Sequence, residues 1–219
     1  MIDPNSNETG AIEVALRRGS DVERNPGEER LRAAEAAARL TRRIADEGLA
    51  DVSYATAESP FGTLLLAATR RGLLRLAFPE EDPDAMLEGL ARRISPRIIE
   101  APEALVEVRR ELDQYFSGRR RAFELALDWR LVGTFGRRVL RVTSQIPYGG
   151  VLSYAEVAAD AGSPRGSRAA GNALGSNPIP IVIPCHRVLR SGGALGGYGG
   201  GIQRKRWLLE LEGARSPAL

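Results

Sequence analysis

The only cysteine and the only histidine of this 219-residue chain stand next to each other, as Cys185 and His186, and Arg187 follows them. A thiol becomes a nucleophile when a nearby base or cation favours its thiolate, so these residue types suit covalent chemistry on sulfur. Consecutive side chains of an extended strand point to opposite faces, so the pair can cooperate only if the chain turns or a water bridges them. Pro184 favours such a turn. A lone cysteine is also commonly an inert core residue, and the residues by themselves leave both interpretations open.

The counts of these two residue types exclude other kinds of site. One cysteine cannot form an intramolecular disulfide, which favours a reducing compartment. One cysteine and one histidine cannot build the usual structural zinc site within a monomer, so we expect no metal, and we expect no cofactor. No stretch approaches the roughly 18 apolar residues that a membrane helix needs, and the polar, acidic start of the chain is unlike a secretory signal peptide. We therefore expect a cytoplasmic globular protein.

The charge is distributed unevenly along the chain. Residues 130–219 contain twelve Arg or Lys but only four Asp or Glu, which gives this segment a net charge of +8 and leaves −5 for residues 1–129. Such an asymmetry is typical of a polyanion-binding half next to a neutral or acidic half. Thirty of the thirty-one basic residues are arginine, so a general preference for arginine and a solvated basic face explain the pattern equally well.

Before residue 130 the sequence predicts a mixed arrangement of helices and strands. Residues 1–50 form an extension, with a polar tail followed by a helix over 29–47 that ends at Gly48. Residues 51–129 are predicted as a small α+β domain. Its expected elements are three strands of an antiparallel meander within 52–78, a helix at 84–94, a short strand at 97–99, a helix at 103–116 and a strand at 122–127.

Residues 130–219 are predicted as a mostly helical domain. A helix is expected over 135–145, and Ser153–Glu156 has the spacing of a capping box that starts the next helix. Ser163-Pro164 is predicted to begin a further helix, in the proportions of a helix-turn-helix, and this second helix would be the recognition helix. Its small residues would let its backbone approach another surface closely. Taken alone, such a pair is more commonly ordinary helix packing.

The segment around the cysteine resembles the active-site motif of the methylated-DNA–protein-cysteine S-methyltransferases, the family of alkyltransferases that repair 6-O-alkylguanine. The resemblance rests first on Pro184-Cys185-His186-Arg187-Val188. It extends over further segments in the family's order, which are 146–154, 167–173 with Asn177-Pro178, 197–201, 204–209 and Glu212-Gly213. It is dense over 130–213 and loose over 52–129, and residues 1–50 lie outside it.

This resemblance implies an α+β fold, with an antiparallel sheet in a small N-terminal α/β domain and a winged helix-turn-helix-like DNA-binding motif in a mostly helical C-terminal domain. The implied activity is direct and irreversible transfer of the alkyl group of 6-O-methylguanine, and of 4-O-methylthymine, to the protein's own cysteine. The partner would be double-stranded DNA that contains alkylated bases, and the damaged nucleotide would be flipped out of the stack. The protein would be a monomer, and each molecule would react only once.

The resemblance also implies catalytic roles for four residues. Cys185 would accept the alkyl group, and His186 would act through water as the base that generates the thiolate. Glu212 would orient this histidine and stabilise its charge. Asn177 would brace the turn between the recognition helix and the active-site strand.

Further residues would contact DNA or the flipped base. The resemblance implies that Arg168 enters the base stack and that Tyr154 rotates the phosphate or contacts the base. Tyr198 would form a wall of the base pocket, the Gly199 amide would donate to the 6-oxygen, and the carbonyl of Val188 would accept from the exocyclic amine. Other residues expected along the DNA are Ser153, Ser167, Ala169 and Gly171.

The chain departs from the family pattern at several positions. Gly199 stands where some members have serine, Gly166 and Ser167 stand where alanine is common, and the zinc ligands of some members' N-terminal domain are missing. Two other functions are weighed against the transferase. A lesion sensor would bind damaged bases without transfer, which the presence of Cys185 argues against. A Cys–His hydrolase would need an oxyanion hole, for which the sequence has no signal.

Overall fold

The computed structural model describes residues 26–46 and 48–214, and the chain divides into two units, Met1–Leu40 and Thr41–Leu219. Helix α2, Pro26–Asp46, confirms the helix predicted over 29–47 and begins three residues earlier. Glu28 and Glu29 in its first turn and Arg43 in its last turn complement the helix dipole. No helix in the described ranges is both long enough and apolar enough to cross a membrane.

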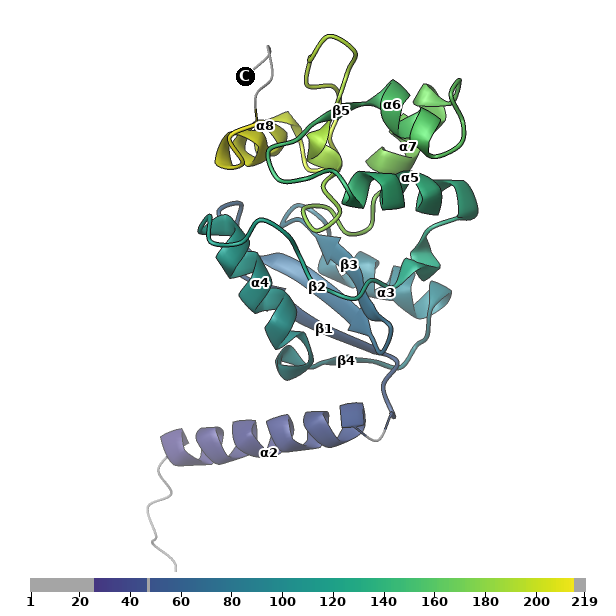
Figure 1. Cartoon of the computed structure of the whole chain (residues 1–219). Helices are drawn as coiled ribbons and strands as arrows, with labels where there is room; N and C mark the ends of the chain where they lie inside the picture. The colour runs from purple at the N-terminus through teal and green to yellow at the C-terminus, as the bar shows by residue number, and fades with distance from the viewer. Residues whose placement is uncertain (1–25, 47, 215–219) are drawn as a thin grey trace, which may run out of the picture. The chain divides into compact units, whose positions relative to one another are not determined.

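The first half of the second unit is a four-stranded sheet with the strand order β3-β2-β1-β4 (Figure 1). Strands β1 (Val52–Ala57), β2 (Leu64–Thr69) and β3 (Gly72–Ala77) form the antiparallel meander that the sequence predicts. Strand β4 (Ile98–Glu100) confirms the short strand expected near 97–99 and pairs in parallel with β1.

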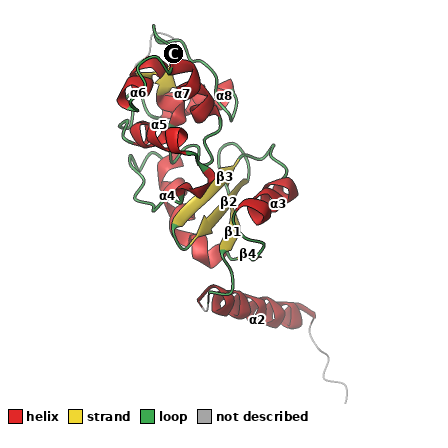
Figure 2. Ribbon diagram, turned by 90° about the vertical axis from the view of Figure 1, so that its right-hand side faces the viewer, coloured by secondary structure: helices red, strands yellow, loops and turns green. Residues whose placement is uncertain are grey.

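Helices α3 (Pro83–Arg93) and α4 (Val106–Phe116) lie on opposite faces of this sheet (Figure 2). The side chain of Asp82 caps α3 by accepting the Asp84 amide at 3.0 Å. Helix α4 buries Val108, Leu112 and Tyr115 against one face, whereas Leu90 of α3 packs with Val52, Ala67 and Leu74 of the other face. The helix predicted over 103–116 is therefore confirmed, except that its first turn, Pro102–Leu105, is a 3₁₀ helix.

The strand predicted over 122–127 is wrong. This segment makes a single isolated bridge, between Leu73 and Leu127, and is otherwise a loop. The Glu124 amide donates to the carboxylate of Glu111 at 3.0 Å instead of to a neighbouring strand. Close to the bridge, a Cβ at Gly72, whose φ is +123°, would lie 2.1 Å from the carbonyl oxygen of Ala126, so only glycine fits there.

The second half of the unit is mostly helical. It contains α5 (Thr134–Ser144), β5 (Leu152–Ser153), α6 (Tyr154–Asp160), α7 (Ser167–Gly175), the 3₁₀ turn Cys185–Arg187, β6 (Val188–Leu189) and α8 (Ile202–Leu211). The capping box of Ser153 and Glu156 is confirmed, and α6 and α7 pack together as the expected helix pair. The predicted start of the second helix at Ser163 is wrong, because the Gly166 amide donates to the Ser163 carbonyl at 2.7 Å and closes a turn first.

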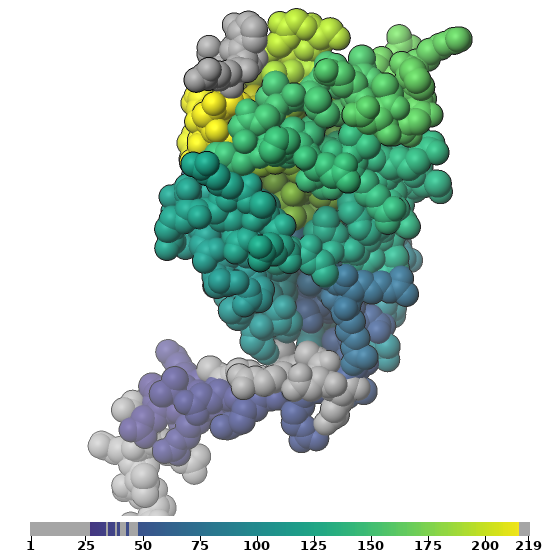
Figure 3. Space-filling model, viewed as in Figure 1, coloured from purple at the N-terminus to yellow at the C-terminus, as the bar shows by residue number. Residues whose placement is uncertain are grey.

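The two halves of this unit share one hydrophobic core. Leu66 and Leu76 of the sheet belong to the same buried cluster as Val139 and Leu140 of α5 and Ile183, which lies two residues before the 3₁₀ turn. The Leu76 amide donates to the Pro178 carbonyl at 2.8 Å. In the space-filling view the surfaces of the two halves are in contact along their boundary (Figure 3). The sheet thus supports the segment that carries the cysteine.

Candidate active site

The sole cysteine lies on a tight turn. The 3₁₀ turn Cys185–Arg187 begins directly after Pro184, and the Arg187 amide donates to the Pro184 carbonyl at 2.9 Å. The chain therefore turns where the proline predicts it, so Cys185 and His186 do not lie on opposite faces of an extended strand. Both side chains are buried, with 6% exposure of Cys185 and none of His186.

Asn177 holds the approach to this turn. Its Nδ2 donates to the Ile183 carbonyl at 2.9 Å and to Sγ of Cys185 at 3.2 Å, while its Oδ1 accepts the Ile179 amide at 3.0 Å. Ile181, which lies between Ile179 and Ile183 in the chain, has a φ of +73°, a left-handed conformation that is costly for a β-branched residue. One side chain therefore fixes a strained loop and contacts the sulfur at the same time.

Behind the cysteine, Glu212 is the centre of a buried polar network. Its Oε1 accepts His186 Nε2 at 3.0 Å, an Arg187 guanidinium nitrogen at 2.8 Å and the hydroxyl of Tyr115 at 2.6 Å. Its Oε2 accepts Arg187 Nε at 2.8 Å and the Gly149 amide at 3.3 Å. Arg187 binds the carboxylate with two parallel hydrogen bonds, which is the geometry that gives strong pairing.

The network fixes the protonation of its members. Burial alone would raise the pKa of Glu212, but the hydrogen bonds from His186 and Arg187 outweigh it and lower this pKa to about 2. Burial lowers the pKa of His186, against the opposing effect of Glu212, so the ring is neutral at pH 7. Because Nε2 contacts the carboxylate, it carries the proton, and Nδ1 is left as an acceptor. Nδ1 is buried and has no hydrogen-bond partner within the described residues.

Lys205 of α8 is a second buried basic residue next to the turn. Its Nζ donates to the Val188 carbonyl at 2.6 Å and lies 3.4 Å from the Gly197 carbonyl oxygen. Burial lowers the pKa of Lys205 to about 8. Burial also raises the pKa of the Cys185 thiol to about 11, against the opposing Asn177 hydrogen bond and the charge of Lys205. The resting cysteine is therefore a thiol that needs a base.

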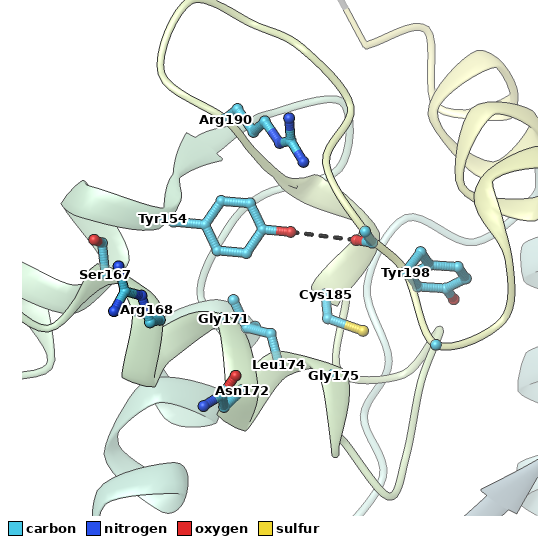
Figure 4. A pocket seen from close by; sticks show the side chains of 12 residues that line it. Tyr154, Ser167, Arg168, Gly171, Asn172, Leu174, Gly175, Cys185, Arg190 and Tyr198 are labelled. Atoms are coloured by element: carbon cyan, nitrogen blue, oxygen red, sulfur yellow. Dashed lines mark hydrogen bonds between the residues drawn. The ribbon is translucent and has the colours of Figure 1, made fainter.

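A pocket of about 690 Å³ opens onto the cysteine from the α7 side (Figure 4). Ser167 and Arg168 lie at one end of this hollow, and Cys185 and Tyr198 lie at the other. The ring of Tyr154 crosses between them, and its hydroxyl donates to the Gly197 carbonyl at 3.2 Å. The lining is completed by Gly171, Asn172, Leu174, Gly175, Arg190, Gly197 and Gly199.

The structure brings most of the residues singled out in the sequence to this pocket or directly behind it. Three of them lie elsewhere. Ser153 caps α6 through its hydroxyl, which accepts the Glu156 amide at 3.2 Å. Ala169 is exposed on α7 but does not line the pocket. Val188 is fully buried, and its carbonyl accepts from Lys205.

Sequence reasoning missed two members of the site. Tyr115 reaches Glu212 across a separation of 97 residues, and no local pattern points to it. Lys205 had a signal, because it is the single lysine in a chain with thirty arginines. A buried ammonium group can lose its proton far more readily than a guanidinium group, so an arginine at position 205 would not be equivalent to this lysine.

Two family models cover most of the chain. The model described as "6-O-methylguanine DNA methyltransferase, ribonuclease-like domain" matches residues 52–129, and the one described as "6-O-methylguanine DNA methyltransferase, DNA binding domain" matches residues 134–214. Helix α2 lies outside both matches.

Similar proteins and structures agree with these matches. The methylated-DNA–protein-cysteine methyltransferase of Mycolicibacterium paratuberculosis is 41% identical over 167 residues, which are 76% of this chain and 96% of that protein. The constitutive enzyme of that name from Bacillus subtilis is 38% identical over 161 residues, covering 73% and 94%. The crystal structure of Mycobacterium tuberculosis OGT in complex with DNA has 42% identity and a TM-score of 0.64, and the match covers 76% of this chain and 96% of that one.

Proposed function

Because this chain belongs to the methylated-DNA–protein-cysteine methyltransferase family, we propose that it repairs 6-O-methylguanine in double-stranded DNA by taking the methyl group onto Sγ of Cys185. The observation that carries the proposal is the arrangement around that sulfur. The single thiol of the chain lies at the end of an open pocket, and its Sγ accepts a hydrogen bond from Asn177. The next residue, His186, is hydrogen-bonded to Glu212 in the buried network.

The chemistry is an in-line displacement at the methyl carbon. The thiol proton passes through a water to Nδ1 of His186, and the sulfur attacks the carbon. The S–C bond forms as the bond from carbon to the 6-oxygen breaks, and the electron pair leaves on guanine, which takes up one proton. The thioether has no easy reverse reaction, so each molecule acts once. 4-O-methylthymine presents the same type of methyl ether and is proposed as a second substrate.

The hydrogen bonds of His186 support its role as the base. Glu212 occupies Nε2, so the nitrogen that is left to accept a proton is Nδ1. The negative charge of Glu212 stabilises the imidazolium that forms, and Arg187 keeps Glu212 ionised. Lys205, buried near Cys185, favours the thiolate electrostatically.

The pocket supports access by a flipped nucleotide. Extrusion of a base from the duplex costs a few kcal/mol, and the small residues of α7 let the helix backbone come close to DNA. Arg168 is exposed at the far end of the pocket and has no ion-pair partner among the described residues, so we propose that it fills the space the base leaves. The basic segment after residue 130 supplies phosphate contacts that carry no sequence information.

We also propose that the protein acts as a monomer in the cytoplasm, since one chain supplies the thiol, the base and the pocket that the proposed reaction needs, and a free thiol suits a reducing compartment. The transferase is tested with a duplex whose 6-O-methylguanine carries a labelled methyl group. We expect label on the wild-type protein, in the peptide that contains Cys185, and none on Cys185→Ala, which still binds the duplex. Label on the variant, or on another peptide, would overturn the assignment.

A further inference from the structure

Arg204, in the first turn of α8, crosses the boundary between the two halves of the unit. Its side chain is 18% exposed, and its guanidinium carbon lies 4.7 Å from the centre of the Phe78 ring and 5.5 Å from that of the Phe61 ring. Phe78 directly follows β3, and Phe61 lies in the connection between β1 and β2. A cation over the face of an aromatic ring is attracted by the electrons of that ring. The sheet half thus binds a side chain of the helical half.

The hydrogen bonds of Arg204 extend this contact to the loop before α8. One terminal nitrogen donates to the Gly200 carbonyl at 2.9 Å, and the other forms an ion pair with Glu80. Glu80 follows Phe78 by two residues in the chain. The planar fork of a guanidinium group lets one side chain hold both partners at once. Arg204 therefore ties the Gly200 carbonyl to the sheet half.

Residues 198–201 form a turn, which we call the pocket turn, and two of them, Tyr198 and Gly199, line the pocket beside the thiol. A hydrogen bond of 3.0 Å from the amide of its last residue to the carbonyl of its first closes the turn. The ring of Tyr198 packs edge-on against that of Phe78, with the two ring centres 6.2 Å apart. The sheet half therefore contacts the pocket turn at two points, through this ring and through Arg204.

On the basis of the function proposed above, we propose that Arg204 is a positioning residue for alkyl transfer and holds the pocket turn in the conformation that receives guanine. Five of the six residues 196–201 are glycine, so the backbone here has little conformational preference of its own. Arg204 does not line the pocket and acts on it through the Gly200 carbonyl. The conformation of the pocket turn thus depends on contacts from outside it.

The pocket turn affects the rate because of the place where charge develops. As the bond from the alkyl carbon to the 6-oxygen breaks, negative charge gathers on that oxygen, and the Gly199 amide is the donor that the family resemblance directs to it. A donor stabilises such charge best when it is already held at hydrogen-bond distance. We therefore expect loss of the contact with Arg204 to slow transfer more than it weakens binding of the base.

The test uses the free base 6-O-benzylguanine, which enters the pocket without base flipping, and measures the maximum single-turnover rate and the apparent affinity. Arg204→Met keeps a long apolar side chain between the two rings but removes the hydrogen bond and the ion pair. We expect its maximum rate to fall roughly tenfold, less than the hundredfold or more that follows loss of the donor itself, and its affinity to change little. Arg204→Lys keeps the charge but lacks the planar fork, so it should recover only part of the rate.

A second reaction distinguishes positioning from a general loosening of the fold. Iodoacetamide alkylates the thiol of Cys185 without using the pocket turn, so its rate in Arg204→Met should stay close to that of the wild-type protein. A loosened fold would expose the buried thiol and speed this reaction. The matched control is Arg206→Met, which removes an exposed arginine from the same helix and should leave both reactions unchanged.

The outcomes separate this inference from the function on which it rests. Slower benzyl transfer with unchanged alkylation by iodoacetamide in either Arg204 variant would support the positioning role. An unchanged maximum rate of benzyl transfer in both variants, or a faster reaction with iodoacetamide that accompanies the slower transfer, would overturn it. Absence of methyl transfer from a duplex to the wild-type protein would instead contradict the proposed function.

Discussion

The two sides of Cys185 are built on opposite principles. On the inner side, one buried carboxylate, Glu212, accepts five hydrogen bonds from His186, Arg187, Tyr115 and Gly149. On the outer side, four glycines and two tyrosine rings make up half of the pocket lining, no carboxylate belongs to it, and the hydroxyl of Tyr198 is buried without a partner among the described residues. The inner side fixes a base in one tautomer, and the outer side leaves room for a substrate that supplies its own hydrogen-bonding groups.

The largest effect is expected where the inner network loses its charge. Glu212→Gln leaves the Arg187 guanidinium buried without its carboxylate, so we expect the free energy of unfolding to fall by about 3–5 kcal/mol. We also expect slower alkyl transfer, because His186 loses the charge that stabilises its protonated form. Chemical denaturation and single-turnover transfer measure the two effects. The control is Glu210→Gln, an exposed carboxylate two residues earlier, and an equal loss in both variants would contradict the network.

The same carboxylate predicts how stability depends on acid. The pKa of Glu212 is about 2 in the folded protein against 4.5 in the unfolded reference state. The ionised carboxylate therefore adds to the free energy of unfolding in full above pH 4.5, and this contribution is lost as the pH falls towards 2. The loss amounts to about 3 kcal/mol. Denaturation measured across this range should show a steeper decline for the wild-type protein than for Glu212→Gln. Parallel profiles would mean that the carboxylate is not held ionised by its partners.

A variant of Arg168, the arginine at the end of the pocket away from Cys185, tests the role of the outer side. Only a duplex requires base flipping, so Arg168→Ala should slow repair of a duplex roughly tenfold to a hundredfold while reaction with the free base 6-O-benzylguanine stays close to normal. Arg165→Ala removes the same charge from the turn before α7 and should affect both substrates little. Equal losses on both substrates in Arg168→Ala would remove this residue from flipping.

The smallest effect concerns the glycines of the loop that closes the pocket. A Cβ at Gly200 would lie 2.6 Å from the ring of Phe78, whereas one at Gly199 meets only an ordinary contact at 3.5 Å. We expect Gly200→Ala to lower the free energy of unfolding by about 1–3 kcal/mol through overpacking, and Gly199→Ala to lower it less. Thermal unfolding of the two variants gives the comparison, and a reversed order would contradict the packing described here.

The same contrast explains what could be predicted from the sequence. Cys185 and His186 are adjacent and unique, and Pro184 marks the turn, so local reasoning identifies a candidate, which the family resemblance then selects over an inert core cysteine. Asn177 and Glu212 follow only from family spacing, because their contacts with Cys185 and His186 form when the chain folds back.

The errors also have a physical cause. Tyr115, which sequence reasoning missed, reaches Glu212 from helix α4 in the other half of the unit. In the segment 122–127, which is predicted as a strand, the Glu124 amide donates its hydrogen bond to the side chain of Glu111. Such pairings depend on tertiary contacts, which periodicity and turn residues do not encode.

The most direct test of the central claim is the intact mass of the protein after incubation with an excess of duplex that carries one 6-O-methylguanine. The arrangement of Cys185, His186 and Glu212 predicts that one methyl group replaces one hydrogen per molecule and that the gain saturates there. An unchanged mass despite lesion-selective binding would contradict it and identify a lesion sensor instead.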